Sequence, residues 1–212
     1  MPWPGEALLA RAREAWAERT DAAAQPVLAE DIPSSVSIEE CRRLSELAHG
    51  KRVLEVGSYF GRSTVALAST AAIVHTVDVH PADDLGLGLA TTAGALIENL
   101  DRHNLRHKVV VHVGFSQLIL PELPRASFDL IFLDAQHQRE PVEEDLAAIL
   151  PLARANAVLA FHDYGVPGVE HGGRWDSFGV TEVVDEFAAQ RTIPVEVVET
   201  LAVVRLEQYQ PQ

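Results

Sequence analysis

The sequence has few of the features on which several classes of protein depend. It has one cysteine, Cys41, which excludes a disulfide within the chain and favours the reducing cytoplasm. With 31 acidic and 17 basic residues, its formal net charge is −14, which argues against nucleic acid and anionic membranes as partners. No apolar run reaches the roughly 18 residues of a membrane-spanning helix, and no signal-peptide pattern opens the sequence. We therefore expect a soluble, cytoplasmic protein.

The length and composition are those of a globular protein with one full-sized core. Hydrophobic residues make up 47% of the 212 residues and charged residues 23%, both ordinary for a soluble domain. We expect a main domain over residues 37–212, preceded by an N-terminal part over residues 1–36. An amphipathic helix is predicted in this first part, over residues 6–19. We interpret the N-terminal part either as a lid over a ligand site or as part of a homodimer interface.

Strands and helices are predicted to alternate along the main domain. Ser37 and Glu40 have the spacing of a capping box that begins a helix, and Gly50 ends this helix. Strands are expected near residues 52–57, 72–78, 108–113, 128–134, 156–162, 193–198 and 201–206. Further helices are expected near residues 62–70, 92–103, 115–120, 141–150 and 178–190.

This order of elements indicates the fold class. Strands that are apolar along most of their length are typical of a parallel sheet covered by helices on both faces. The last two strands are separated by about two residues, too few for a crossover, so they must form an antiparallel hairpin. The sequence thus predicts an α/β fold with a Rossmann-like, seven-stranded, mostly parallel sheet, a C-terminal antiparallel hairpin and helices on both faces. Connections over about residues 79–91 and 164–177 are expected to be long loops that contact substrate.

The most informative pattern lies in residues 53–64. A short apolar strand leads into Gly57 and Gly61 and then into the start of a helix, where an α/β sheet binds nucleotide-like ligands. Tyr59 stands where a dinucleotide-binding turn has its second glycine, which leaves less room for a pyrophosphate. The next predicted strand ends in Asp78, whose carboxylate can accept hydrogen bonds from both hydroxyls of a ribose. A ribose without a pyrophosphate indicates S-adenosylmethionine.

The stretch Glu55-x-Gly57-x-x-x-Gly61-x-Ser63-Thr64 resembles motif I of the class I S-adenosylmethionine-dependent methyltransferases, and further motifs follow in the same order up to about residue 206. The turn Val113–Ser116 resembles the one along the adenine, and Phe128–Asp134 resembles the fourth-strand motif that ends in a functional acid. The pattern and the resemblance together predict contacts to S-adenosylmethionine from Glu55, Gly57, Ser58, Tyr59, Gly61, Ser63, Asp78, Val79, Phe115, Ser116 and Asp134.

The segment Phe161–Tyr164 resembles the fifth-strand end of the small metal-dependent O-methyltransferases, similar to catechol, caffeoyl-coenzyme A and natural-product sugar O-methyltransferases. This resemblance implies a divalent metal, Mg²⁺ or another ion, on Asp134, His162 and Asp163. His162 departs from the usual pair of acidic or amide residues, and Mg²⁺ accepts imidazole poorly. Three alternatives follow: His162 turns away from Mg²⁺, the site takes a metal that accepts nitrogen, or no metal binds and His162 acts on a proton.

His137 follows Asp134 by three residues and is a candidate for the base that takes a hydroxyl proton; the alternative is a surface histidine. For His171 and Trp175, in the Gly-rich segment 165–179, we consider two roles: lining an acceptor pocket, or only packing the loop. The predicted function is O-methylation of a hydroxyl on a small molecule, such as a secondary metabolite or sugar, with His137, Asp134 and His162 as catalytic residues. The alternatives are metal-free N- or O-methylation by a histidine base and a non-catalytic module that binds S-adenosylmethionine.

Overall fold

The computed structural model describes residues 26–80, 92–171 and 174–206. The helix expected over residues 6–19, and residues 81–91 of the first expected loop, lie outside the described residues. Within the described ranges, a seven-stranded sheet has the strand order β3-β2-β1-β4-β5-β9-β8. Its strands are β1 Arg52–Val56, β2 Ile73–Asp78, β3 Val109–Val113, β4 Phe128–Leu133, β5 Ala153–Phe161, β8 Val195–Val198 and β9 Leu201–Arg205.

The first five of these strands are parallel, and β9 pairs antiparallel with both β5 and β8. This arrangement confirms the predicted Rossmann-like α/β fold with its C-terminal antiparallel hairpin. The helices are α2 Ile38–Ala48, α3 Arg62–Thr70, α4 Thr92–Arg102, α5 Ser116–Ile119, α6 Arg139–Ile149 and α7 Val180–Arg191. Short 3₁₀ helices cover Arg106–Lys108, Leu120–Glu122 and Leu150–Leu152.

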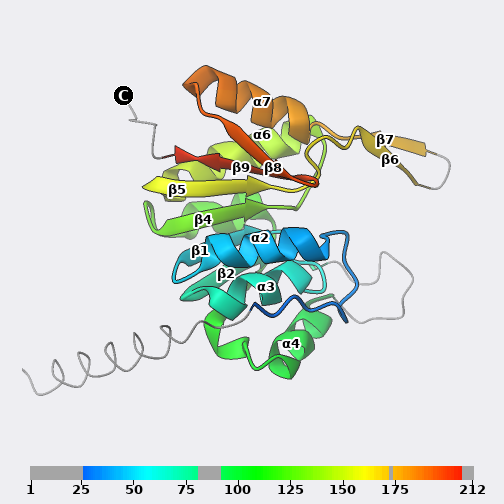
Figure 1. Ribbon diagram of the computed structural model, residues 1–212, viewed down its shortest axis with the longest axis vertical. Coiled ribbons are helices and arrows are strands. Elements are labelled where there is room, and N and C mark those ends of the chain that lie inside the picture. Colours follow the sequence, from blue (N-terminus) through cyan, green and yellow to red (C-terminus); the bar gives the residue numbers. More distant parts are fainter. Residues whose placement is uncertain (1–25, 81–91, 172–173, 207–212) are drawn as a thin grey trace, which may run out of the picture.

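Helices cover both faces of the sheet (Figure 1). Alternate side chains of each central strand enter two separate hydrophobic cores, one on each face. In β4, for example, Leu130 and Phe132 pack on the side of α2, α3 and α4, while Ile131 and Leu133 pack on the side of α6 and α7. All four of these side chains are buried. Two covered faces explain why these strands are continuously apolar.

Two sequence predictions were wrong. The fifth strand begins at Ala153 rather than near residue 156. The segment 164–177 is not a simple loop, because it contains an antiparallel pair, β6 Gly168–His171 and β7 Arg174–Ser177, which projects from the body in Figure 1. A Cβ on Gly168 would lie 2.3 Å from the backbone oxygen of Asp176, so glycine at this position is what allows the two strands to approach.

The described residues before α2 are part of the core rather than a separate body. Ala29, Ile32 and Val36 are buried in the core on the α2 side. Arg62, at the start of α3, donates hydrogen bonds to the backbone oxygens of Val36 (3.0 Å) and Glu30 (3.4 Å). This segment is therefore fixed beside the glycine turn that precedes α3.

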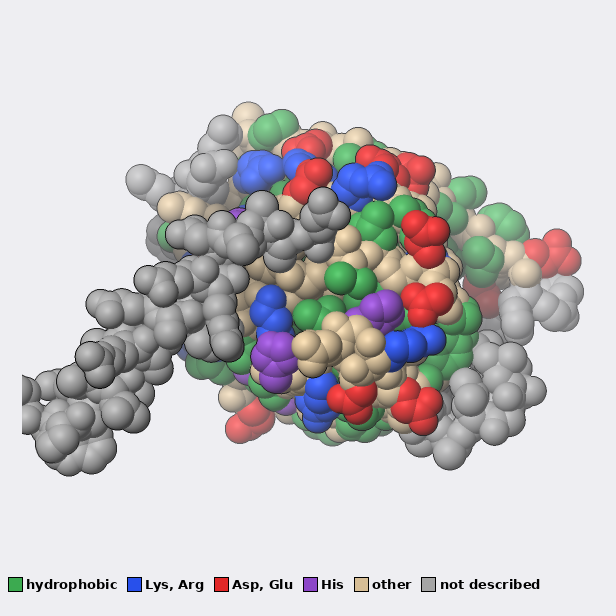
Figure 2. All heavy atoms as spheres, turned by 60° about the horizontal axis from the view of Figure 1, so that its bottom comes forward, with side chains coloured by type: hydrophobic (Ala, Val, Ile, Leu, Met, Phe, Trp, Pro, Cys, Tyr) green, Lys and Arg blue, Asp and Glu red, His purple; other side chains and the backbone are tan. Residues whose placement is uncertain are grey.

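The surface in Figure 2 has acidic and basic side chains interspersed, and the basic ones do not gather into one patch among the described residues of this face. In the described part of the chain, no helix has both the length and the apolar character needed to cross a membrane.

Candidate functional site

A cavity of about 620 Å³ lies at the carboxyl ends of β1, β2 and β4. This volume is in the range of about 300–1,000 Å³ typical of small-molecule sites. Most of the predicted cofactor residues line it, namely Gly57, Ser58, Tyr59, Ser63, Asp78, Val79, Phe115, Ser116 and Asp134. The structure thus brings residues from four separate motifs to one cavity.

The glycines of the first turn allow close packing at the edge of this cavity. Gly57 and Gly61 both have a φ of +92°, a conformation that side chains with a Cβ rarely adopt. A Cβ on Gly57 would lie 2.1 Å from the backbone oxygen of Asp134, and one on Gly61 would lie 2.4 Å from Cδ1 of Leu96. Gly61 does not itself line the cavity; it lets α4 pack against the turn.

Asp78 holds the glycine turn in place through backbone hydrogen bonds. Its Oδ2 accepts from the N–H groups of Ser58 (2.7 Å) and Tyr59 (2.9 Å), and its Oδ1 accepts from the N–H of His80 (2.7 Å). Burial alone would raise the pKa of Asp78, but these three donors outweigh it and lower the pKa below its usual value. The carboxylate is therefore ionised. Oδ2 already accepts two backbone hydrogen bonds, whereas Oδ1 accepts one from the His80 N–H and retains a lone pair for a ligand.

Glu55 lies beneath the turn and does not line the cavity. The Ser63 hydroxyl donates to its Oε1 (2.7 Å) and the Thr64 hydroxyl to its Oε2 (2.6 Å). Its side chain is completely buried, and this burial raises its pKa to about 7 despite the two hydroxyl donors. From this position, Glu55 can hold the start of α3 and the glycine turn in place, but it does not reach the cavity.

Phe115 lines another wall of the cavity and is 61% exposed among the described residues, so its ring is accessible to a ligand. Next to it, the Ser116 hydroxyl donates to Oδ1 of Asp145 on α6 (2.6 Å).

Sequence reasoning missed Pro33, Ser34 and Ser35, which also line the cavity. They lie in an irregular segment without periodicity, so only the capping box that follows could have suggested that this segment is fixed in place.

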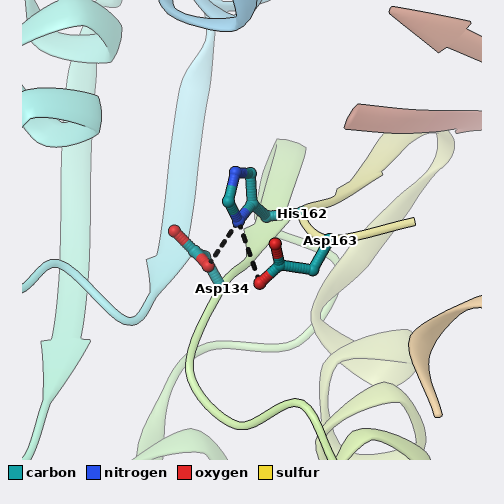
Figure 3. A group of neighbouring side chains, drawn as sticks. All are labelled: Asp134, His162 and Asp163. Carbon is teal, nitrogen blue, oxygen red and sulfur yellow. Dashed lines mark ion pairs between the residues drawn. The ribbon is translucent and has the colours of Figure 1, made fainter. Parts of the chain in front are cut away.

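An acid–histidine cluster lies at one end of the cavity, where β4 and β5 end. Nδ1 of His162 lies 3.1 Å from Oδ1 of Asp134 and 3.3 Å from Oδ2 of Asp163, and Figure 3 shows both contacts converging on this one nitrogen. One ligand atom from each of the three residues lies within 4.8 Å of the others. Asp163 has a φ of +59°, a strained backbone conformation of a kind that often occurs at functional sites.

His162 points into the acid pair and does not turn away from it. The side chain is buried, and within the described residues neither ring nitrogen makes a hydrogen bond of good geometry. Burial alone would lower the pKa of His162, but the carboxylates of Asp134, Asp163 and Glu40 raise it to about 12. A buried imidazole nitrogen without a hydrogen bond, beside two carboxylate oxygens, is a donor set that suits a divalent ion accepting both nitrogen and oxygen.

His137 connects this cluster to the cavity. Its Nε2 lies 2.9 Å from Oδ2 of Asp163 and 3.7 Å from Oδ1 of Asp134, and the residue lines the cavity. Its ring stacks on that of Phe178, with centroids 4.5 Å apart. Burial alone would lower the pKa of His137, but hydrogen bonding and attraction to Asp134 and Asp163 raise it to about 9. The predicted base therefore lies between the acid pair and the ligand space.

Trp175 does not line the cavity: it lies on β7, its side chain is exposed, and its ring packs beside Gly168. The side chain of His171 lies outside the described residues. These two residues therefore add nothing to the site geometry described here, which rests on the glycine turn, Asp78, Phe115 and the acid–histidine cluster.

Comparisons with known proteins agree with this geometry. Residues 54–164 match a family described as a methyltransferase domain. The chain is 31% identical over 180 residues to a catechol O-methyltransferase of Mycobacterium tuberculosis, covering 82% of this chain and 71% of that protein. It is also 35% identical over 105 residues to a protein-L-isoaspartate O-methyltransferase of Roseiflexus castenholzii, a match that covers 49% of this chain and only 43% of that protein.

The fold is shared with the O-methyltransferase TomG from Streptomyces achromogenes, whose crystal structure contains S-adenosylmethionine. The two structures superpose with a TM-score of 0.63 at 21% sequence identity, covering 91% of this chain and 95% of TomG. The expected fold, the order of the motifs and the family match agree. The chain therefore belongs to the class I S-adenosylmethionine-dependent methyltransferases, within the O-methyltransferase family.

Proposed function

We propose that the protein transfers a methyl group from S-adenosylmethionine to a hydroxyl of a small molecule, with a divalent cation held by Asp134, His162 and Asp163. One observation carries the proposal. The acid–histidine cluster adjoins the donor cavity, and Asp134 and His137 belong to both. A site that only binds the donor has no need for titratable groups at this place.

The donor site is proposed to consist of the turn 57–59, Asp78 and Phe115. The donor supplies a methyl group on a positively charged sulfur. Asp78, ionised and fixed by backbone donors, would accept a hydrogen bond from a ribose hydroxyl at Oδ1, and the exposed Phe115 ring would lie along the adenine. The helix start at Ser63 would face the amino-acid end of the donor. These contacts would align donor and acceptor, which is most of what this displacement requires.

The cation site is proposed to favour a metal that accepts nitrogen, such as Mn²⁺, Fe²⁺ or Zn²⁺, over Mg²⁺. The direction of Nδ1 supports this choice, because it lies 3.1 Å from the Asp134 carboxylate rather than turned away. When bound, such a cation would polarise an acceptor hydroxyl and lower its pKa. Against the effect of burial, the attraction of Asp134 and Asp163 raises the pKa of His137, and a bound cation would offset that attraction. The neutral His137 ring, at the border between cluster and cavity, would then collect the hydroxyl proton.

The chemical class of the methyl acceptor is proposed from the ligands that the cation site would leave free. Two neighbouring oxygen atoms on one acceptor would suit a cation that has open positions after three protein ligands. A relative named for catechol methylation supports adjacent hydroxyls as the first acceptors to assay. Secondary metabolites and sugars with adjacent hydroxyls belong to the same chemical class.

The test is methyl transfer to catechol, followed by the mass increase of the product. The protein is stripped with a chelator and assayed alone and after addition of Mn²⁺, Zn²⁺ or Mg²⁺. We expect turnover to be lost on chelation and restored best by Mn²⁺ or Zn²⁺. The Asp163→Asn variant should lose at least about tenfold in turnover, whereas Asp101→Asn, at an exposed acid of α4, should not. Undiminished turnover in chelator would remove the metal and favour a histidine base alone.

A further inference from the structure

Glu40 is a buried acid that the proposed mechanism does not use. It occupies the third position of α2, where its side chain completes the capping box with Ser37. Its exposed fraction is only 1%, although helix N-termini usually face water and glutamate is almost never fully buried unless it is paired. The capping box alone does not require such burial, so the other partners of Glu40 need an explanation.

Three donors hold the Glu40 carboxylate in one orientation. Its Oε1 accepts from the backbone N–H of Thr200 (2.9 Å) and from the Thr200 hydroxyl (2.6 Å). Its Oε2 accepts from the backbone N–H of Ser37 (2.8 Å). These three donors therefore fix the carboxylate between α2 and the β8–β9 turn.

The remaining contact of Glu40 is to His162. Oε2 of Glu40 lies 3.4 Å from Nε2 of His162, and both side chains are about 2% exposed. The two nitrogens of an imidazole lie on opposite sides of the ring, so a partner at Nε2 determines where Nδ1 points. In Figure 3, Nδ1 faces Asp134 and Asp163 while the other nitrogen points away from them.

We propose that Glu40 is a positioning residue for the cation site. By attracting the Nε2–H of His162, it fixes the ring so that Nδ1 faces the space between Asp134 and Asp163. A cation that displaces the Nδ1 proton would then meet the Nδ1 lone pair in the right direction. Metal-binding histidines are commonly held in this way by a carboxylate at the other nitrogen. The inference rests on the cation site of the proposed function. It adds to that site Glu40, which precedes Asp134 by more than 90 positions in the sequence.

Glu40 also accounts for the presence of histidine at position 162. An acidic residue there would lie beside the ionised Glu40 in a buried place, where like charges repel strongly. Histidine instead gives Glu40 an opposite or neutral partner and still presents one ligand atom to the cation site. Glu40 and His162 are therefore a matched pair, and changing either alone should disturb the site.

The test measures the affinity for Mn²⁺ by calorimetry, with S-adenosylhomocysteine affinity as the check on folding. The variant is Glu40→Gln, and the matched control is Glu39→Gln, at the neighbouring exposed acid that pairs with Arg42. We expect Glu40→Gln to weaken Mn²⁺ binding by about 10- to 100-fold with little change in S-adenosylhomocysteine affinity. Glu39→Gln should match the wild type in both.

Each outcome is decisive. Equal Mn²⁺ affinity in Glu40→Gln and wild type would overturn the positioning role and leave the cation site standing. Absence of Mn²⁺ binding to the wild type would overturn the cation site and this inference with it. If Glu40→Gln does not fold, the double variant Glu40→Gln/His162→Glu is compared with His162→Glu alone. The inference requires that Glu40→Gln improve the Mn²⁺ affinity of His162→Glu, and no improvement would contradict it.

Discussion

Gly57 lies directly against the backbone of Asp134: a Cβ on Gly57 would stand 2.1 Å from the Asp134 carbonyl oxygen. The first glycine of the donor turn therefore sets the distance between the turn and the end of β4. The same backbone carries the Asp134 carboxylate to the acid–histidine cluster. The close packing of Gly57 on Asp134 thus fixes the donor cavity and the proposed cation site relative to each other.

The Gly57→Ala variant should lose both stability and donor binding. The added methyl group must displace the end of β4, and alanine does not tolerate a φ of +92°. We expect a loss of about 3 kcal/mol or more in the free energy of unfolding and weaker binding of S-adenosylhomocysteine. Denaturant unfolding and calorimetry measure these effects. As a control, Gly94→Ala adds its methyl group inside α4, where no heavy atom of the described residues outside the helix's own backbone lies within 4 Å. It should stabilise by about 0.5–1 kcal/mol.

Glu55 should make stability depend on pH in a direction opposite to that of most carboxylates. Its folded-state pKa, about 7, lies above the unfolded value of 4.5, so the folded protein binds more protons between these pH values. The stability from Glu55 is complete below pH 4.5 and is lost as pH rises to 7. Glu55→Gln should remove this decline, which we expect to reach up to about 3 kcal/mol.

The measurement is the free energy of unfolding of wild type and variant at pH 4.5, 5.5 and 7, the range that the Glu55 pKa values span. The difference between the two proteins isolates Glu55 from the other titrating groups. Glu122→Gln, at an exposed acid, should show a constant difference from the wild type. A constant difference for Glu55→Gln as well would contradict the account of its burial.

Cys41 should be unreactive in the folded protein. Its side chain is completely buried in the core on the α2 side, and this burial raises the pKa of the thiol to about 12. An aromatic disulfide reagent at pH 8 should release no measurable thiolate product from the native protein and one equivalent per chain after unfolding. Because the chain has a single cysteine, the unfolded protein is its own control. Rapid reaction of the native protein would mean that α2 opens.

Most of the fold could be predicted from local sequence patterns. Continuous apolar runs, capping signals and the short link at Glu199 and Thr200 determine the sheet, because each acts within a few residues. The pair β6–β7 was missed because the close approach of Gly168 to Asp176 depends on cross-strand contact, and the glycine alone indicates a turn.

The site residues that could be predicted from the sequence are those that lie at the ends of strands. Carboxyl ends of parallel strands meet at one edge, so Asp78 and Asp134 could be assigned to one edge from their positions. Asp163 was expected there from the resemblance to the metal-dependent O-methyltransferases. Glu40 could not be assigned to the site, since its capping box explains it locally and its contact with His162 depends on how α2 packs across the sheet. The same holds for Pro33–Ser35, which only the packing of Ile32 and Val36 brings to the cavity.

The most direct test of the whole account is the binding of S-adenosylhomocysteine to the wild type and to Asp78→Ala, measured by calorimetry with Asp101→Ala as control. The account predicts one site per chain in the wild type, unchanged binding in Asp101→Ala, and at least about tenfold weaker binding in Asp78→Ala, because that carboxylate both fixes the glycine turn and faces the ligand. Equal affinity in Asp78→Ala and wild type would contradict it.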